Sequence, residues 1–284
     1  MQILYSLLRP FMLLILVLQQ ADQIKIEQMT SFERQTRLVW AEEFHEDGLP
    51  NPEYWNFEHG FVRNYEYQWY QPENAWIEDG LLIIEGRRER VVNPNYIPDS
   101  DNWRLNREFA EYTSTSLHTR GRLSWKFGRF EMRARIDIDS GLWPAWWTLG
   151  VEGQWPHNGE IDIMEYYRGM LLANAAWGTE EQWVAAWDDS RTPISELGDN
   201  WADEFHVWRM DWDENFIHLY VDDMLLNKID LSETINPDGK NPFHQPHYML
   251  LNLAIGGTNG GDPSETEFPG RFEIDYIRVY EWID

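Results

Sequence analysis

The sequence RFEMRARI, residues 129–136, alternates polar and apolar side chains without a break. Because successive side chains of a β-strand point to opposite faces, this period of two predicts a strand with one buried and one exposed face. Similar short runs lie between turn residues elsewhere, at residues 81–85, 216–221 and 271–280. No segment keeps a helical period over three turns. We therefore expect an all-β fold, an antiparallel sandwich or barrel.

The length and charge of the chain restrict its class. It has 284 residues, with 49 acidic and 23 basic side chains and a formal charge of −26. Residues 38–284 contain no linker or fixed-period repeat, so we predict a single domain there. The charge disfavours nucleic acid and anionic membranes as partners. The absence of cysteine from the sequence excludes disulfides and thiolate metal sites.

The chain is unusually rich in tryptophan, with 17 of these residues beside 13 tyrosines and 13 phenylalanines. Two explanations fit this content. A large sandwich core would bury the rings, whereas a groove for sugars would expose some of them, because aromatic faces stack on the C–H-rich faces of pyranose rings.

The N-terminal segment, residues 1–21, reads MQILYSLLRPFMLLILVLQQA. Its apolar run from Phe11 to Leu18 follows Arg9 and is too short to cross a bilayer. This pattern predicts a secretory signal peptide, with an uncleaved N-terminal anchor as the alternative. In both cases we expect the domain to work outside the cytoplasm, secreted, periplasmic or at the cell surface, with no membrane contact beyond this leader.

The segment EIDIME, residues 160–165, carries the strongest chemical signal. In a strand, Glu160 and Asp162 project from one face, about 6.6 Å apart along the chain, while the two isoleucines enter the core. Strict alternation would bury Glu165, and an unpaired buried carboxylate is costly. A β-bulge near Met164 would return Glu165 to the face of the other two acids, as bulges beside active sites often do.

Three acids on one face suit glycoside hydrolysis with retention. This reaction needs two carboxyl groups about 5–5.5 Å apart, one as nucleophile and one as proton donor to the leaving oxygen. A third acid between them separates their roles by repulsion and hydrogen bonding. The alternative is an ordinary exposed strand in a very acidic protein.

Aromatic residues precede this segment in GLWPAWW, residues 141–147. We predict that Trp143 and Trp146 form the floor of a sugar groove and that Trp147 turns into the core. Trp177 joins the candidate substrate-binding residues. The glycine-rich residues 256–262 lack the lysine and helix of a phosphate loop, so we expect a loop that faces the substrate.

The hexapeptide EIDIME resembles the signature of glycoside hydrolase family 16, in the bulged form of its laminarinase-like members. The resemblance covers nearly the whole chain after the leader. Further matches are LVWAEEF (38–44), NYEYQWY (64–70), YTS (112–114), GRFE (128–131), GLWPA (141–145), QPHY (245–248) and DYIRVY (275–280).

The resemblance implies a β-jelly-roll sandwich with a concave substrate cleft, and endo-hydrolysis of a β-linked polysaccharide. Glu160 would be the nucleophile, Asp162 its electrostatic helper and Glu165 the acid/base. No cofactor is implied for catalysis. Many members hold a structural calcium, a hard cation that suits oxygen ligands. The remaining carried-over positions are Asn64, Trp143, Trp146 and Gln245 for sugar binding, and Glu43 and Asp275 for calcium.

At two places the sequence departs from the laminarinase-like pattern, so the resemblance does not decide which polysaccharide is the substrate. Ala176 stands where laminarinase-like members usually carry a histidine, so we expect the leaving-group side of the cleft to differ. His59 and Arg63 could contact a sulfated sugar or simply pair with acids. We therefore expect a β-1,3-glucan or mixed-linkage glucan, with an agar-, carrageenan- or mucin-type galactan as the alternative. A non-catalytic sugar-binding sandwich and a transglycosylase are further alternatives. We expect a monomer.

Overall fold

The computed structural model describes residues 34–283. The expected leader, residues 1–21, lies outside them. Leu38–Glu281 form one compact unit, and residues 34–37 and 282–283 fall outside it. No helix among the described residues is long and apolar enough to cross a membrane. The acidic segment at residues 160–165 and the strands around it lie entirely in Leu38–Glu281.

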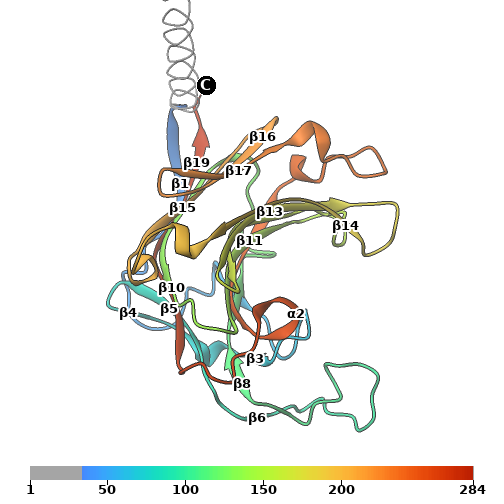
Figure 1. Ribbon diagram of the computed structural model, residues 1–284. Helices are drawn as coiled ribbons and strands as arrows, with labels where there is room; N and C mark the ends of the chain where they lie inside the picture. Colours follow the sequence, from blue (N-terminus) through green and yellow to red (C-terminus); the bar gives the residue numbers. More distant parts are fainter. Residues whose placement is uncertain (1–33, 284) are drawn as a thin grey trace, which may run out of the picture. The chain divides into compact units, whose positions relative to one another are not determined.

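Two large sheets form the body of the protein (Figure 1). The first has antiparallel ladders from β17 to β4, and β1 also pairs with β19. In spatial order its strands are β17 (Met224–Asp230), β16 (Phe216–Val221), β15 (His206–Trp212), β10 (Gly128–Ile136), β19 (Gly270–Trp282), β5 (Leu81–Gly86) and β4 (Ala75–Glu78), with β1 (Thr36–Glu42) beside β19.

The second sheet is antiparallel throughout and carries the acidic segment. Its strands, in spatial order, are β14 (Ala185–Pro193), β13 (Met170–Gly178), β12 (Glu160–Tyr167), β11 (Leu142–Gly150), β18 (His247–Ile255), β9 (Ser116–His118) and β2 (Asn56–Phe57). These two sheets confirm the predicted all-β sandwich of the jelly-roll type.

Short elements complete the body. Two small sheets pair β3 (Gln68–Tyr70) with β8 (Tyr112–Ser114) and β6 (Val91–Val92) with β7 (Phe109–Ala110). The helical turns are η1 (Pro72–Asn74), η2 (Ile194–Glu196), η3 (Trp201–Asp203), η4 (Leu231–Glu233), η5 (Pro242–His244) and α2 (Gly257–Gly260).

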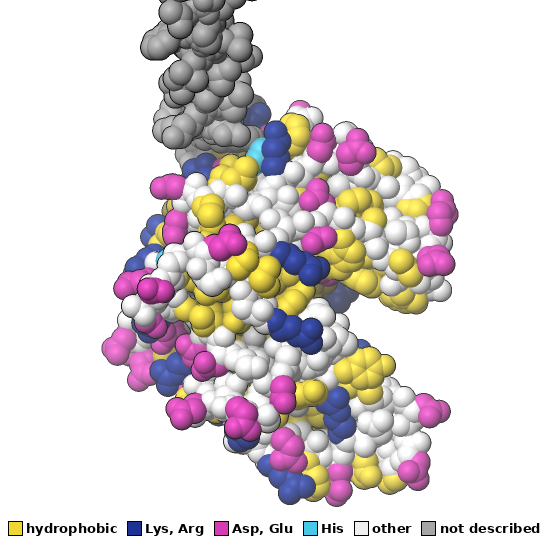
Figure 2. All heavy atoms as spheres, viewed as in Figure 1, with side chains coloured by type: hydrophobic (Ala, Val, Ile, Leu, Met, Phe, Trp, Pro, Cys, Tyr) yellow, Lys and Arg dark blue, Asp and Glu magenta, His cyan; other side chains and the backbone are white. Residues whose placement is uncertain are grey.

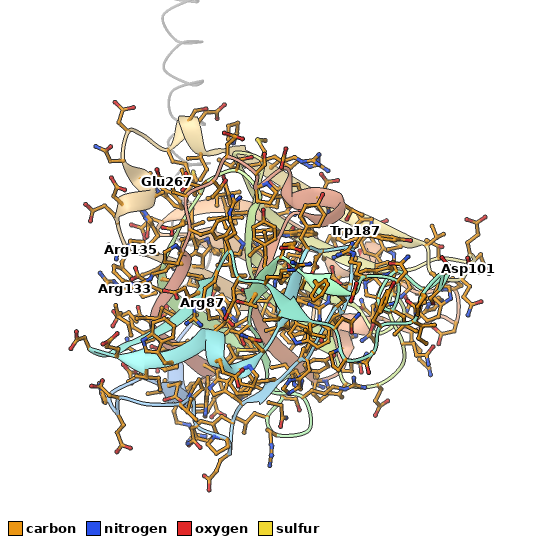
Figure 3. The ribbon with its side chains drawn as sticks, turned by 90° about the horizontal axis from the view of Figure 1, so that it is seen from below. Arg87, Asp101, Arg133, Arg135, Trp187 and Glu267 are labelled. Carbon is orange, nitrogen blue, oxygen red and sulfur yellow. The ribbon has the colours of Figure 1, made fainter. Side chains whose placement is uncertain are left out.

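The core lies between the two sheets, and β10 illustrates how the sequence builds it. Its apolar residues, from Phe130 to Ile136, are buried in the core, as the alternation predicts. The intervening arginines point outward, where Arg133 pairs with Asp275 and Arg135 with Glu273. Figure 3 shows Arg133 and Arg135 on the side of the sandwich opposite to Trp187 of β14. Alternation along β10 thus separates a row of core residues from an outward-facing row of ion pairs.

Candidate active site

The acids of β12 lie in rows that run across the second sheet. The register places Asp162 opposite Asn174 of β13 and opposite Trp147 of β11. Glu165 lies in the next row, opposite Leu172 and Ala145. All three acids line one cleft. The sheet therefore gathers side chains from four or more strands around a short segment of β12.

A β-bulge makes this arrangement possible. Along β11 the partner of Trp146 is Met164 and the partner of Trp147 is Asp162, so Ile163 is the extra residue. The ladder with β13 shifts between Asp162 and Glu165. Ile163 and Met164 are both buried in the core, which returns Glu165 to the cleft. The bulge lies where the sequence predicts it.

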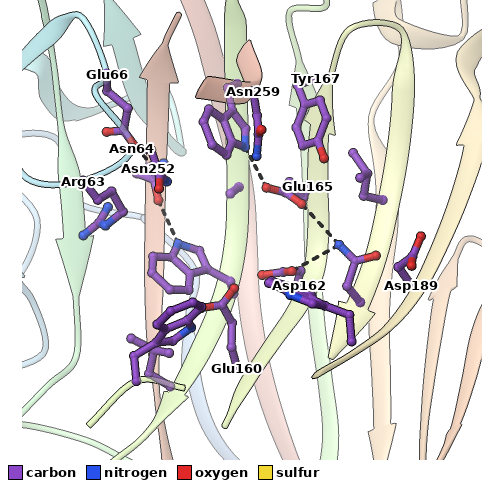
Figure 4. A pocket seen from close by; sticks show the side chains of 18 of the residues that line it. Arg63, Asn64, Glu66, Glu160, Asp162, Glu165, Tyr167, Asp189, Asn252 and Asn259 are labelled. Atoms are coloured by element: carbon purple, nitrogen blue, oxygen red, sulfur yellow. Dashed lines mark hydrogen bonds between the residues drawn. The ribbon is translucent and has the colours of Figure 1, made fainter. Parts of the chain in front are cut away.

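Hydrogen bonds orient Glu165 from two sides (Figure 4). The Trp143 Nε1–H donates to its Oε1 at 2.7 Å, and the Asn174 amide donates to its Oε2 at 3.3 Å. The same amide donates to Asp162 Oδ2 at 3.2 Å. The Ser190 backbone N–H donates to Asn174 Oδ1, which fixes the amide orientation. Asn174 thus links the middle and the last acid of the trio.

Burial raises the pKa of all three acids, and repulsion by neighbouring carboxylates adds to this for Glu160 and Glu165. The pKa of Asp162 rises from 3.8 to about 7, because burial outweighs the stabilising Asn174 hydrogen bond. For Glu165, burial and the charge of Asp162 raise the pKa well above its usual value, against the Trp143 hydrogen bond. A raised pKa favours the protonated carboxyl group, which is the form that a general acid requires.

The pKa of Glu160 is also raised, mainly by burial and then by the charges of Asp162 and Glu165. A hydrogen bond from Trp155 and the charge of Arg63 act in the opposite direction. A proton on either neighbouring acid removes a negative charge and so favours ionised Glu160. The trio therefore titrates as a unit in which one member can be anionic beside a protonated one.

The cleft has a volume of about 690 Å³. Figure 2 shows this face of the body as a hollow between the β14 side and the β6–β7 side. On the β18 side, Trp147 Nε1–H donates to Asn252 Oδ1 at 2.8 Å, and Arg63 stacks over the Trp147 ring at 5.2 Å. Polar and aromatic side chains from the surrounding loops and strands complete the lining, among them Asn64, Glu66, Trp155, Tyr167, Trp187, Asp189, Arg191 and Asn259.

The family model of glycosyl hydrolases family 16 matches residues 91–278 of this chain. The chain belongs to that family. As a family 16 glycoside hydrolase it is an endo-acting enzyme and needs no catalytic cofactor.

Two curated relatives resemble the enzyme along most of its length. The β-glucanase of Rhodothermus marinus is 35% identical over 275 residues, which cover 87% of this chain and 86% of that protein. The glucan endo-1,3-β-glucosidase of Cryptopygus antarcticus is 32% identical, with 86% and 92% covered.

Two solved structures also resemble the enzyme over most of its length. The catalytic domain of an endo-1,3-β-glucanase (laminarinase) from Thermotoga petrophila has a TM-score of 0.74 at 34% identity and covers 88% of the enzyme and 100% of that chain. A structure from work on endo-acting O-glycanases, with which human gut bacteria initiate mucin breakdown, has a TM-score of 0.80 at 35% identity, with 88% and 92% covered.

The prediction for the three tryptophans of β11 is right for Trp143 and wrong for Trp146 and Trp147. Trp143 lines the cleft, as expected. Trp146 is fully buried in the core between the sheets, whereas Trp147 lines the cleft. The reason is the period of two in a strand, which places Trp143, Ala145 and Trp147 on one face and Trp146 on the other. A spacing of three residues cannot put two side chains on the same face of a regular strand.

Two other predicted substrate residues lie outside the cleft lining. Trp177 packs against the core, because on β13 it points to the opposite face from Asn174 and Ala176. The Gln245 amide instead holds the 151–159 loop, since Nε2 donates to the Asn158 carbonyl at 3.1 Å and Oε1 accepts from the Glu152 N–H at 2.8 Å. Asn64 does line the cleft, and its amide donates to Glu66 Oε1 at 3.3 Å.

The predicted calcium residues do not fit a cation site. Glu43 accepts two hydrogen bonds from Arg278, at 2.7 and 2.9 Å, and Asp275 accepts one from Arg133 at 2.6 Å. Each carboxylate is thus already neutralised by a guanidinium group. Within residues 34–283, no group of three His, Asp or Glu side chains is placed to hold a metal ion.

Sequence reasoning missed much of the cleft wall. Trp155, which hydrogen-bonds Glu160, comes from a loop, and Asn252 comes from a strand nearly ninety residues after the acids. Trp187, Asp189 and Arg191 alternate along β14, and this period of two was the available signal. We predicted that residues 256–262 face the substrate, and Asn259 of α2 does line the cleft.

Proposed function

We propose that the enzyme cleaves its polysaccharide by double displacement with retention of configuration. Glu160 attacks the anomeric carbon while Glu165 gives its proton to the departing glycosidic oxygen, which leaves a glycosyl ester on Glu160. Glu165, now ionised, takes a proton from water as the water attacks the same carbon, and the bond from that carbon to Glu160 breaks to release the sugar and the Glu160 carboxylate. Asp162 holds the trio in register through Asn174 and adjusts the pKa of both neighbours. Every step uses side chains of this chain.

The single observation that carries this proposal is the bulge between Asp162 and Glu165. It brings three titratable acids with raised pKa values to one cleft face. An incidental acidic strand would leave its carboxylates in solvent at ordinary pKa values. The cost of burying three such groups is explained when they do chemistry.

For the substrate we propose a β-1,3-glucan or mixed-linkage β-glucan. Support comes from the named activities of the relatives in Rhodothermus, Cryptopygus and Thermotoga. The cleft also suits a neutral chain, because its two lining arginines face acids: Arg63 pairs with Glu58 and Arg191 with Asp189.

A second candidate is a β-linked galactan of the mucin type. It is favoured by the O-glycanase structure, whose TM-score exceeds that of the Thermotoga laminarinase, and by a 25% identical keratan-sulfate endo-1,4-β-galactosidase of Sphingobacterium multivorum. The small Ala176 opposite Glu160 is consistent with a substrate that differs from laminarin near the nucleophile.

One panel separates these candidates. Laminarin, lichenan, agarose, porphyran, carrageenan, keratan and mucin O-glycans are incubated with enzyme, and new reducing ends and product lengths are measured. We expect internal cleavage of laminarin or lichenan. Cleavage of a galactan alone would select the second candidate. Binding without new reducing ends would indicate a sugar-binding protein, and products longer than the input would indicate a transglycosylase.

We further propose that the enzyme acts outside the cytoplasm as a monomer. The apolar segment before residue 22 supports export. N-terminal sequencing of the exported protein would locate the cleavage site, and light scattering would give a mass no larger than the 34.0 kDa of one full chain. A dimer mass, or protein retained in the cytoplasm, would contradict the respective proposal.

A further inference from the structure

We infer that Trp187 is a sugar-binding platform that holds the departing sugar beside Glu160. When the glycosyl group is transferred to another sugar instead of water, the same platform would hold that acceptor sugar. This inference rests on the proposed double-displacement mechanism. Trp187 belongs to the edge strand β14 and lines the cleft. It has no part in the chemistry assigned to the trio.

The register places Trp187 in the row of the nucleophile. Trp187 is the partner of Ala176, and Ala176 is the partner of Glu160. Neighbouring strands lie about 4.8 Å apart, so the Trp187 and Glu160 backbones are separated by about 10 Å. Only the methyl group of Ala176 occupies the row between them. We expect a pyranose ring to lie above that methyl group, between the indole of Trp187 and the carboxyl group of Glu160.

The exposure of Trp187 differs from that of the other cleft tryptophans. Its side chain is 46% exposed, against 6% for Trp143 and 9% for Trp147. The latter two use their indole N–H groups to hold Glu165 and Asn252. These hydrogen bonds hold both rings in place, which suits the sugar that stays bound through the covalent intermediate. An open aromatic face suits the sugar that must leave before water enters.

The platform is held firmly although β14 is an edge strand. Its even-numbered residues point away from the cleft and reach β17 of the other sheet. The Ser190 hydroxyl donates to the Leu226 carbonyl at 2.7 Å, and the Asn227 amide donates to Asp188 Oδ1 at 3.0 Å. These contacts fix the odd-numbered face, where Trp187 is followed by Asp189 and Arg191, which offer polar groups to sugar hydroxyls. A fixed aromatic face loses little entropy when a sugar stacks on it.

The test compares two leaving groups on the same enzyme. One substrate is an oligosaccharide of whichever polysaccharide the wild type cleaves, and the other is the matching β-glycosyl fluoride, whose leaving group carries no sugar. We expect Trp187→Ala to lower kcat/KM on the oligosaccharide about tenfold or more, while turnover of the fluoride stays within about twofold of wild type. Trp187→Phe should recover much of the loss.

Trp183→Ala is the matched control. Trp183 is 55% exposed, lies four residues earlier and is not part of the cleft lining. We expect this variant to match wild type on both substrates. Added acceptor oligosaccharide should yield transfer products with wild type and clearly fewer with Trp187→Ala, because the acceptor enters the site that the departing sugar vacates.

The possible failures are distinguishable. If wild type releases sugar from no oligosaccharide, the proposed function fails. If wild type is active and Trp187→Ala equals it on the oligosaccharide, the platform is refuted. An equal loss on oligosaccharide and fluoride would assign Trp187 to the sugar that stays bound, which also overturns the inference.

Discussion

At the scale of single residues, the two glutamates have separable roles. We expect Glu160→Ala and Glu165→Ala to fold like wild type and each to lose turnover on the polysaccharide by about a thousandfold or more. Azide should rescue both with opposite stereochemistry. Without Glu160, azide displaces the leaving group directly and gives the inverted glycosyl azide. Without Glu165, azide attacks the ester on Glu160 and gives the retained one.

The substrate for this rescue is the glycosyl fluoride, because fluoride leaves without a strong acid. Product configuration is read by proton NMR. Retained azide from Glu160→Ala, or inverted azide from Glu165→Ala, would show that the roles are exchanged. Glu152→Ala, at a residue outside the cleft lining, controls for nonspecific effects of losing a carboxylate.

The Trp143 indole sets the basic limb of the pH profile. Its hydrogen bond to Glu165 lowers the pKa of that group, against the larger effect of burial. Trp143→Phe removes this donor, so the pKa of Glu165 should rise and Glu165 should keep its proton to higher pH. We expect the alkaline limb of kcat/KM to move upward, measured on a short oligosaccharide. A downward shift would mean that Glu165 is not the acid.

The middle acid costs stability at neutral pH. Because Asp162 has a folded pKa of about 7 against an ordinary 3.8, the folded state binds more protons between these values. The free energy of unfolding therefore falls as pH rises from 3.8 to about 7. Asp162→Asn should raise Tm above about pH 7 and change it little near about pH 4. Thermal melts across this range test it, and an equal Tm gain at both ends would contradict it.

At the scale of elements, the bulge in β12 predicts how deleting or inserting one residue in this strand changes activity. Deleting Met164 would restore a regular strand in which Glu160, Asp162 and Glu165 still alternate onto one face. Since Met164 is a core residue, we expect a lower Tm, but more turnover than Glu165→Ala retains. Inserting one alanine between Met164 and Glu165, with the bulge at Ile163 kept, adds one strand position and should instead turn Glu165 inward and abolish turnover.

Circular dichroism establishes that both length variants fold. A deletion variant that is folded yet no more active than Glu165→Ala would contradict this prediction. The bulge would then have a role beyond placing Glu165 on the cleft face of the strand.

The same element shows what sequence reasoning can reach. Alternation and the cost of burying Glu165 were enough to predict the bulge, because both depend on neighbours along the chain. Trp146 was wrongly placed in the cleft although it lies three residues after Trp143. Strict application of the two-residue period puts these two side chains on opposite faces. Gln245, Glu43 and Asp275 failed for another reason. Their partners Asn158, Arg278 and Arg133 come from distant segments, so no local pattern reveals that these polar groups are already engaged.

At the scale of the whole molecule, the charge of −26 should select among polysaccharides. A neutral glucan gains nothing from the protein's field, so its KM should change by less than about twofold between about 0.05 and 0.5 M NaCl. A sulfated galactan is repelled, so its cleavage, if any, should improve with salt. Initial rates on laminarin and carrageenan across this range test the point. Salt-weakened cleavage of carrageenan would reveal a cationic subsite.

The position of β14 at the rim of its sheet has a further consequence. A rim strand presents unpaired backbone groups to any passing chain, and a long apolar one invites strand-to-strand aggregation. On β14, however, Asp188, Asp189 and Arg191 interrupt the run. An added strand would have to place its own side chains beside these ionic groups. The strand that offers an aromatic face to sugar is thus protected by its own charges from fibril-like pairing.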